Sequence, residues 1–217
     1  MKKFIPFLFA LVLFASCEKE PDTDKLHNQY MVYTQYDKKA NFGNYSTFYI
    51  PDSVLVIGGS EKPVYWTDSE NPNAEKIIAA YVTNMTNRGY KQTNDKDEAD
   101  LGLQVSYIEN TNYFVDYPYD NWWGGYPGYW GPDYWGSSWN NYGWYYPFPI
   151  VYSYSTGSLL TELVDLKTPG TDKKMTVLWN SFISGLLSGN ETIDITKTVS
   201  GINQSFNQST YLKTTLK

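Results

Sequence analysis

The sequence contains one cysteine and one histidine among 217 residues, and both scarcities exclude kinds of site. A lone cysteine forms no disulfide within the chain, so stability depends on packing. The histidine, His27, lies near the amino terminus, where a catalytic triad or a histidine-built zinc site would have to recruit it from the edge of a domain. The sequence also lacks the phosphate loop, the Gly-x-Gly-x-x-Gly fingerprint and the Gly-x-Ser-x-Gly elbow. These absences indicate a protein that is not an enzyme and holds no cofactor.

Basic charge is also in short supply. The chain carries 17 lysines and arginines against 23 aspartates and glutamates, a formal net charge of −6. Nucleic acids require a basic face, so a nucleic-acid partner is not expected.

Acidic residues gather in two places, and neither predicts a specific site. Asp95, Asp97, Glu98 and Asp100 lack the spacing of a calcium loop and are typical of a solvated acidic loop, so no metal site is expected. Three further carboxylates stand beside aromatic residues, as a glycosidase would need, although any two acidic residues in a loop fit that description. These three residues are Asp116, Asp120 and Asp133.

The sequence contains only one long apolar run, and this run predicts a signal peptide that is cleaved off. Lys2 and Lys3 precede eleven apolar residues at positions 4–14, and small Ala15 and Ser16 stand before Cys17. The run is too short to span a bilayer, which needs roughly 20 apolar residues. A small residue before cysteine resembles the lipobox of bacterial lipoproteins, in which the thiol is acylated. We therefore expect residues 1–16 to be a lipoprotein signal peptide, and Cys17 to carry the lipid.

Residues 17–28 are polar and charged and include a proline, so they predict an extended tether. The acidic residues after Cys17 partly resemble a surface-export signal of lipoproteins, and a solvated leash explains them equally well. We expect anchoring in the outer membrane, on either the periplasmic or the cell-surface face. Without Lys2 and Lys3 the chain keeps 15 basic and 23 acidic side chains, a net charge of −8, so the lipid must provide the anchoring.

Periodicity predicts the regular elements of a single domain over residues 29–211, followed by a tail at 212–217. Apolar residues at helical spacing predict a helix over 72–90 that ends at Gly89, and a second helix over 194–211. Alternating or β-branched residues predict strands at 30–36, 45–50, 101–107, 157–167 and 175–183, with the last two joined by a hairpin loop. The strand at 101–107 alternates as a half-buried strand does. This order indicates an α+β fold, a mainly antiparallel sheet with two helices on one face.

Residues 110–150 form an insertion rich in aromatic residues and glycine, with nine tyrosines and six tryptophans between Asn112 and Phe148. Its glycines and prolines predict a long loop, and long loops are usually functional or disordered. Three interpretations remain open: the loop folds onto its own domain, it binds a glycan or a protein, or it inserts into a membrane interface. The candidate binding residues are Trp122, Trp123, Trp130, Trp135, Trp139 and Trp144.

Three short motifs resemble a known family. Tyr-Asp at 36–37 leads into a Phe42 and Tyr45-Ser-Thr segment, Glu98-Ala-Asp-Leu precedes a strand, and two late strands end with a Val-Leu-Trp segment at Trp179. Together they resemble the bacterial envelope lipoproteins of domain-of-unknown-function family 4136 over about residues 30–211. The resemblance implies no catalytic residues, because the family has no established activity.

The motif residues also have a physical interpretation. We expect Tyr36 and Asp37 to close a turn, Phe42 and Tyr45 to cover a sheet edge, and Trp179 to fill the core between strand and helix. Asp100 or Asp165 is expected to accept hydrogen bonds from backbone amides at strand ends.

The sequence therefore predicts a non-enzymatic, membrane-anchored envelope lipoprotein with a structural or interaction role. Its partners are expected to be the membrane, through the lipid, and an envelope protein or a glycan. The alternative is a surface lipoprotein that uses the aromatic loop to bind a glycan, or to cleave one.

Overall fold

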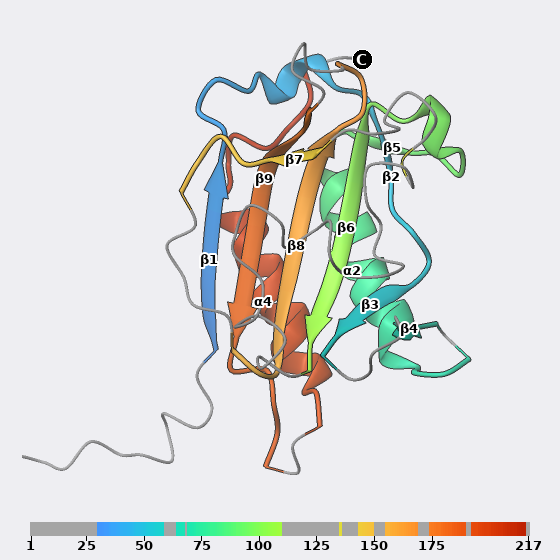
Figure 1. Ribbon diagram of the computed structural model, residues 1–217, viewed down its shortest axis with the longest axis vertical. Coiled ribbons are helices and arrows are strands. Elements are labelled where there is room, and N and C mark those ends of the chain that lie inside the picture. The colour runs from blue at the N-terminus through green and yellow to red at the C-terminus, as the bar shows by residue number, and fades with distance from the viewer. Residues whose placement is uncertain are drawn as a thin grey trace, which may run out of the picture.

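The computed structural model describes residues 30–58, 64–67, 69–109, 135, 143–149, 155–168, 174–189 and 192–215. These residues build a sheet with a layer of two helices on one face and the described part of the aromatic insertion on the other (Figure 1). The predicted signal peptide, tether, Cys17 and His27 lie outside the described residues.

The strands are β1 (Met31–Tyr36), β2 (Thr47–Tyr49), β3 (Val54–Ile57), β4 (Val64–Trp66), β5 (Lys91–Gln92), β6 (Leu101–Ile108), β7 (Gly143–Tyr145), β8 (Ser158–Asp165) and β9 (Lys174–Ser184). The helices are α2 (Asn73–Asn87) and α4 (Ile195–Asn207), with short 3-10 turns η1 (Phe42–Asn44) and η2 (Lys96–Glu98).

The sheet runs β1-β9-β8-β6-β2-β5, with β3 and β4 continuing from β6 and β7 pairing with β9. The long strands β1, β9, β8 and β6 pair antiparallel in that order. The parallel pairs are short: β2 with β5 and β6, β3 with β6, and β7 with β9. The predicted α+β class is therefore confirmed, and the sheet is mostly antiparallel with some parallel pairs.

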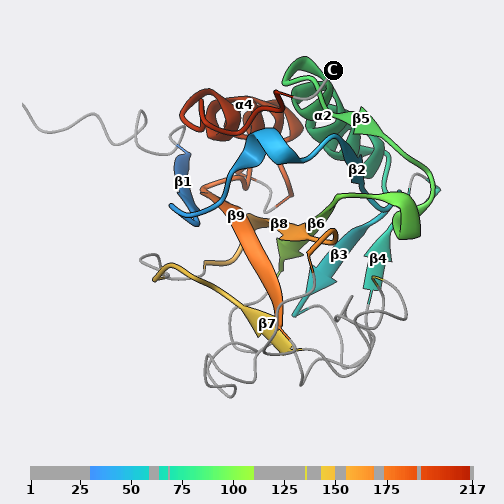
Figure 2. The same cartoon turned by 90° about the horizontal axis from the view of Figure 1, so that it is seen from above.

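Both helices pack on the same face of the sheet, as Figure 2 shows from above. Helix α2 buries Ile77 and Tyr81 at the predicted spacing, and it ends beside Gly89, whose φ of 88° is the left-handed conformation that glycine adopts without strain. Helix α4 buries Ile202 and Phe206. Its amino terminus is capped by Asp194, whose carboxylate accepts the amides of Thr196 (3.0 Å) and Lys197 (3.1 Å).

Trp179 joins the sheet to this helical layer, as the sequence predicts. Its ring is fully buried 5.3 Å from the ring of Phe206, and its indole N–H donates to the hydroxyl of Ser209 at 2.9 Å. The predicted tail also touches this layer, since Leu212 is fully buried.

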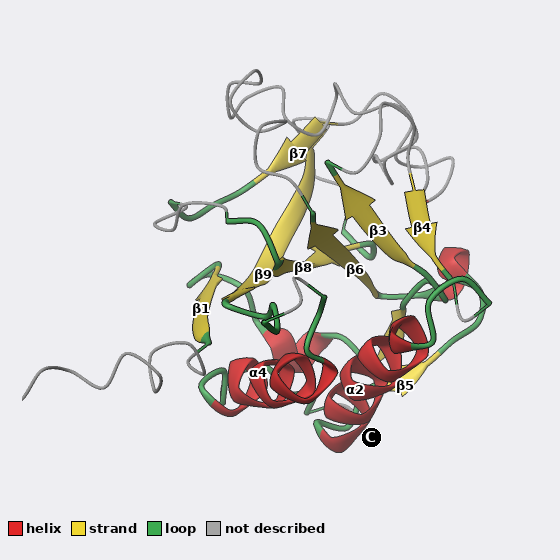
Figure 3. Ribbon diagram, turned by 90° about the horizontal axis from the view of Figure 1, so that it is seen from below, coloured by secondary structure: helices red, strands yellow, loops and turns green. Residues whose placement is uncertain are grey.

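The second face of the sheet is covered by residues from the insertion (Figure 3). Trp135 packs with Val164, Met175 and Val177, and β7 adds Trp144 to the edge of the same cluster. The prediction that the strand at 101–107 is half-buried is therefore wrong, because β6 is buried along its whole length. A strand covered on both faces loses its solvent-facing side, even where its residues alternate in polarity.

The sequence analysis misplaced or missed several short elements. The predicted strand at 45–50 shortens to β2, and β9, β8 and β6 lie between β1 and β2 in the sheet. Strands β3 and β4 were not predicted. Strand β5 was also not predicted, the predicted acidic loop contains η2, and β7 lies inside the predicted loop at 110–150.

Candidate functional site

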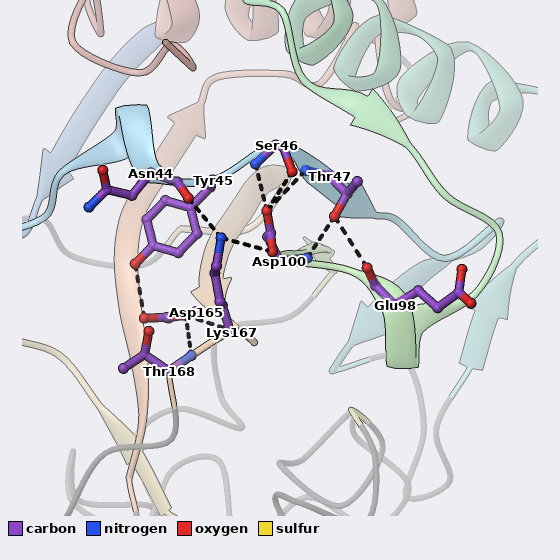
Figure 4. Close-up of polar contacts among 9 residues, drawn as sticks. All are labelled: Asn44, Tyr45, Ser46, Thr47, Glu98, Asp100, Asp165, Lys167 and Thr168. Carbon is purple, nitrogen blue, oxygen red and sulfur yellow. Dashed lines mark hydrogen bonds and ion pairs between the residues drawn. The ribbon is translucent and has the colours of Figure 1, made fainter. Parts of the chain in front are cut away.

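Two polar clusters stand out among the described residues. The first, called here the strand-end network, joins the start of β2, the start of β6 and the end of β8 (Figure 4). The second, called here the buried polar row, crosses the second face of the sheet. Only the first contains residues that the sequence analysis singled out.

In the strand-end network, Asp100 holds the start of β2. Its Oδ2 accepts the backbone N–H of Ser46 at 2.6 Å, the Ser46 hydroxyl at 2.8 Å and the N–H of Thr47 at 3.4 Å. In return the hydroxyl of Thr47 accepts the N–H of Asp100 at 2.9 Å and donates to the carbonyl of Glu98 at 3.3 Å. Lys167 lies 3.4 Å from the other carboxylate oxygen of Asp100. Asp100 thus ties the parallel strands β2 and β6 together.

Asp165 likewise accepts hydrogen bonds from backbone and side-chain groups, at the end of β8. Its Oδ1 accepts the backbone N–H groups of Lys167 (2.9 Å) and Thr168 (3.0 Å), and its Oδ2 accepts the Tyr45 hydroxyl at 2.9 Å. Lys167 also donates to the carbonyl of Asn44 at 2.9 Å. The expectation that Asp100 or Asp165 accepts amide hydrogen bonds is confirmed for both residues.

The pKa values of the two carboxylates shift in opposite directions. Burial raises the pKa of Asp165, and the hydrogen bonds from Thr168, Tyr45 and Lys167 offset only part of that rise. Burial also acts to raise the pKa of Asp100, but the hydrogen bonds from Ser46 and Thr47, with the charge of Lys167, hold it below the usual range. Burial and the neighbouring Asp165 carboxylate raise the pKa of the Tyr45 hydroxyl.

The strand-end network thus serves the fold. Its carboxylate oxygens accept hydrogen bonds from neighbouring backbone and side chains, which is how side chains close turns and strand ends. Phe42 and Tyr45, which were expected to cover a sheet edge, are both buried in the core cluster under the helices. The predicted turn at Asp37 is also present, since its carboxylate accepts the N–H of Lys39 at 2.9 Å.

In the described part of the chain, which includes the acidic loop before β6, no group of three histidine, cysteine, aspartate or glutamate side chains is arranged to bind a metal ion. Asp95 instead caps η2 by accepting the N–H of Asp97 at 2.9 Å. The other candidate carboxylates, Asp116, Asp120 and Asp133, lie outside the described residues.

The buried polar row consists of four residues in register on neighbouring strands. Gln104 of β6 faces Glu162 of β8, Glu162 faces Asn180 of β9, and Asn180 faces Gln35 of β1. Directly opposed residues of antiparallel strands project to the same face, so the four form one line across the sheet. Gln104, Glu162 and Asn180 are fully buried.

Glu162 is the centre of the buried polar row. The Gln104 amide donates to its Oε2 at 3.1 Å, and the Tyr146 hydroxyl, from the residue after β7, donates to its Oε1. Apolar clusters lie on both sides of the row, one around Phe182 and one around Trp135, and Tyr146 packs against both. Through the hydrogen bond between Tyr146 and Glu162, the buried polar row holds the described part of the insertion against the sheet.

The six candidate tryptophans divide into two groups. Trp135 is 1% exposed, lies edge-on to Tyr49 with ring centroids 6.1 Å apart, and touches the backbone of Gly102. Trp144 is half-buried. Trp122, Trp123, Trp130 and Trp139 lie outside the described residues. The interpretation that the loop folds onto its own domain thus describes Trp135, and the other interpretations stay predictions for the four undescribed rings.

Sequence reasoning missed the buried polar row. Gln104 occupied a position of an alternating strand that ordinarily faces water, and Glu162 and Asn180 were passed over within apolar strands. One signal was available. The predicted strands directly before and after the insertion are long. A large aromatic insertion between two such strands can cover the second face of their sheet, so both strands were candidates for burial on both faces.

With the α+β fold and the strand-end network in view, the chain can be placed in a family. It matches the family described as Domain of unknown function (DUF4136) over residues 32–209, and the chain belongs to this family. A DUF4136 family protein from Bacteroides thetaiotaomicron, solved by crystallography, is 51% identical, with a TM-score of 0.74 over 85% of this chain and 97% of that chain. No curated protein matches the chain.

A more distant likeness is to a PelC dodecamer from Paraburkholderia phytofirmans, at 10% identity and a TM-score of 0.39 over 87% of this chain and 100% of that one. This similarity is too weak to support inference. The family itself brings no assigned activity, so the function must be argued from the chain.

Proposed function

We propose that the protein is a lipid-anchored envelope lipoprotein of the outer membrane, with a structural or interaction role and no catalytic one. The observation that carries the anchor is the amino-terminal pattern of Lys2 and Lys3, an eleven-residue apolar run, and Ala15-Ser16-Cys17. None of the helices in the described part of the chain is both long and apolar enough to cross a bilayer.

The geometry of the carboxylates supports the non-catalytic part of the proposal. The oxygens of Asp100 and Asp165 accept backbone amides and the Tyr45 hydroxyl. A general acid or base must reach a substrate proton. Carboxylates used in this way stabilise strand ends instead.

The tether sets how far the domain stands from the membrane. Tyr30, the first described residue, is thirteen residues after Cys17 in the sequence. Fully extended they span at most about 45 Å, and as a flexible coil they average about 20 Å. The domain would therefore work close to the bilayer, against partners of the envelope.

The anchor is tested by labelling the full-length chain in a bacterial host with an alkyne fatty acid. We expect the wild-type chain to take up the label and to pellet with the outer membrane, whereas Cys17→Ser takes up none and leaves the membrane fraction. The variant should keep the far-ultraviolet circular dichroism of the wild type, because Cys17 precedes the described fold. Equal labelling of both chains would overturn the proposal.

Glycan binding is the second candidate, favoured by the density of tryptophan and tyrosine in the insertion. Aromatic rings stack on sugars and offer polar edges. Acrylamide quenching of tryptophan fluorescence, with and without polysaccharide, would test it. Protection of the tryptophan fluorescence from quenching by saturating polysaccharide supports binding, and an unchanged quenching curve would contradict it. We expect Trp135 to contribute little because it is buried.

A further inference from the structure

Glu162 is a carboxyl group buried in the middle of the sheet. Its side chain is 0% exposed and lies in the buried polar row, with the apolar clusters around Phe182 and Trp135 on either side. Removing an ionised carboxylate from water is costly unless a cation or several hydrogen-bond donors compensate it. The charge state of Glu162 therefore depends on the groups that surround it.

The groups that face Glu162 from the described elements are neutral. In the sheet they are the amide side chains of Gln104 in β6 and Asn180 in β9, which lie opposite it on the two neighbouring strands. From residues 143–149 the hydroxyl of Tyr146 donates to Oε1, and Gln104 donates to Oε2 at 3.1 Å. Tyr146 is thus the titratable group in contact with Glu162 from this segment, and a phenol is uncharged at neutral pH.

The insertion brings no positive charge to this face of the sheet. Residues 110–155 contain no lysine, arginine or histidine, and their charged side chains are three carboxylates, Asp116, Asp120 and Asp133. A second carboxylate disfavours ionisation, whereas a cation favours it. Asp100 shows the opposite case, because the charge of Lys167, 3.4 Å away, helps to hold its pKa low.

The buried polar row also holds acceptors that lack a donor. The side-chain oxygens of Gln104 and Gln35 are buried and accept no hydrogen bond. Unpaired carbonyl oxygens leave partial negative charge inside the fold, and this charge opposes a further negative charge nearby. A proton on Glu162 has the reverse effect, since a neutral carboxyl gains one O–H donor and keeps an acceptor oxygen.

We propose that Glu162 is an uncharged carboxylic acid in the folded protein at neutral pH, and that losing this proton destabilises the fold. In the neutral form one oxygen still accepts the Tyr146 hydroxyl, so the contact between the sheet and the insertion is kept. In the unfolded chain Glu162 is in water and releases its proton near the ordinary glutamate pKa of about 4.3. The stabilising contribution of the proton is therefore fully present below that pH, and it is lost as pH rises through the higher pKa of the folded state.

Infrared spectroscopy of the full-length chain tests the charge state, because the C=O stretch of a neutral carboxyl is separate from the bands of an ionised carboxylate. We expect a neutral-carboxyl band at neutral pH that shifts when the glutamates carry carbon-13, and that is absent from Glu162→Gln. Asp165→Asn is the matched control, since burial also raises the pKa of Asp165, and it should keep the glutamate band. The isotope shift is measured on the wild-type chain, so it remains informative if Glu162→Gln folds poorly.

Urea unfolding of wild type and Glu162→Gln from mildly acid to mildly alkaline pH tests the consequence for stability. Glutamine has nearly the shape of a protonated glutamate but does not titrate, and the other titrating groups are common to both chains. The unfolding equilibrium constant of wild type relative to Glu162→Gln should rise with pH, by up to about tenfold per pH unit for one proton. A wild-type spectrum without an isotope-sensitive neutral carboxyl at neutral pH would overturn the proposal, and so would a stability difference that does not change with pH.

Discussion

At the scale of single residues, Asp100 and Asp165 show that the surroundings of an aspartate can shift its pKa in either direction. Both close strand ends, and both were foreseen in that role because an aspartate next to a strand has backbone amides within reach. Which carboxylate would be held ionised was not foreseeable. That depends on Lys167 and Ser46, which only the folded chain brings to Asp100.

The opposite pKa shifts predict opposite pH dependences. Asp165 has a raised pKa, so its stabilising contribution is present at low pH and is lost as pH rises through that pKa. Asp100 has a lowered pKa, so its contribution is present above the ordinary aspartate pKa of about 3.9 and is lost as pH falls. Replacement by asparagine removes each titration while keeping an acceptor oxygen.

The measurement is urea unfolding of wild type, Asp165→Asn and Asp100→Asn between acid and neutral pH. The stability advantage of wild type over Asp100→Asn should grow with pH, and its advantage over Asp165→Asn should shrink. Slopes of the same sign for the two variants would contradict these shifts.

At the scale of elements, the sequence predicted the helices and strands in which a periodic pattern of apolar residues continues over many residues. Helices α2 and α4 and strands β6, β8 and β9 each repeat a pattern over eight or more residues. Strands β4, β5 and β7 have two or three residues, too few to show a period, and they form because neighbouring strands offer partners. Strand β3 is different, since Val54–Ile57 is an apolar run typical of a buried strand and was predictable.

The contact between the insertion and β6 gives a prediction at this scale. A Cβ atom at Gly102 would lie 2.6 Å from the ring of Trp135, closer than real contacts allow. We expect Gly102→Val to destabilise the domain by about 1–3 kcal/mol through overpacking, although valine favours strands. Urea unfolding measures the change.

The matched control is the same substitution in a Trp135→Ala background. There the valine meets no ring, so its cost should largely vanish, and the double-mutant cycle should give a coupling of at least about 1 kcal/mol. Additive effects of the two changes would show that Trp135 does not rest on Gly102.

At the scale of the whole molecule, two layers share one sheet. Helices α2 and α4 pack on one face and residues 143–149 with Trp135 pack on the other, while β6, β8 and β9 supply side chains to both. The sequence predicted the helical layer and left the place of the insertion open. Long-range burial decided that place, because the buried polar row and the apolar residues around it need cover on the second face.

This arrangement predicts cooperative unfolding. Circular dichroism at 222 nm reports the helices. Tryptophan fluorescence reports all eight tryptophans, which in the described part of the chain are Trp66 and Trp179 in the core on the helical side and Trp135 and Trp144 on the second face. Because the shared strands cannot lose one layer and keep their packing on the other, both signals should change at the same urea concentration. A fluorescence transition well below the helical one would show that the second layer detaches on its own.

The position of β9 also sets the timing of folding. The strand nearest the amino terminus, β1, completes its pairing only with β9, whose residues come some 140 positions later. In a chain that crosses a membrane amino-terminus first, β1 would emerge early and remain without its neighbour until almost all of the protein had followed. Such non-local pairing is slow and leaves apolar strand surface open to wrong contacts. In such a chain the first strand would need protection, for example by a chaperone, during the interval between its own arrival and that of the last strand.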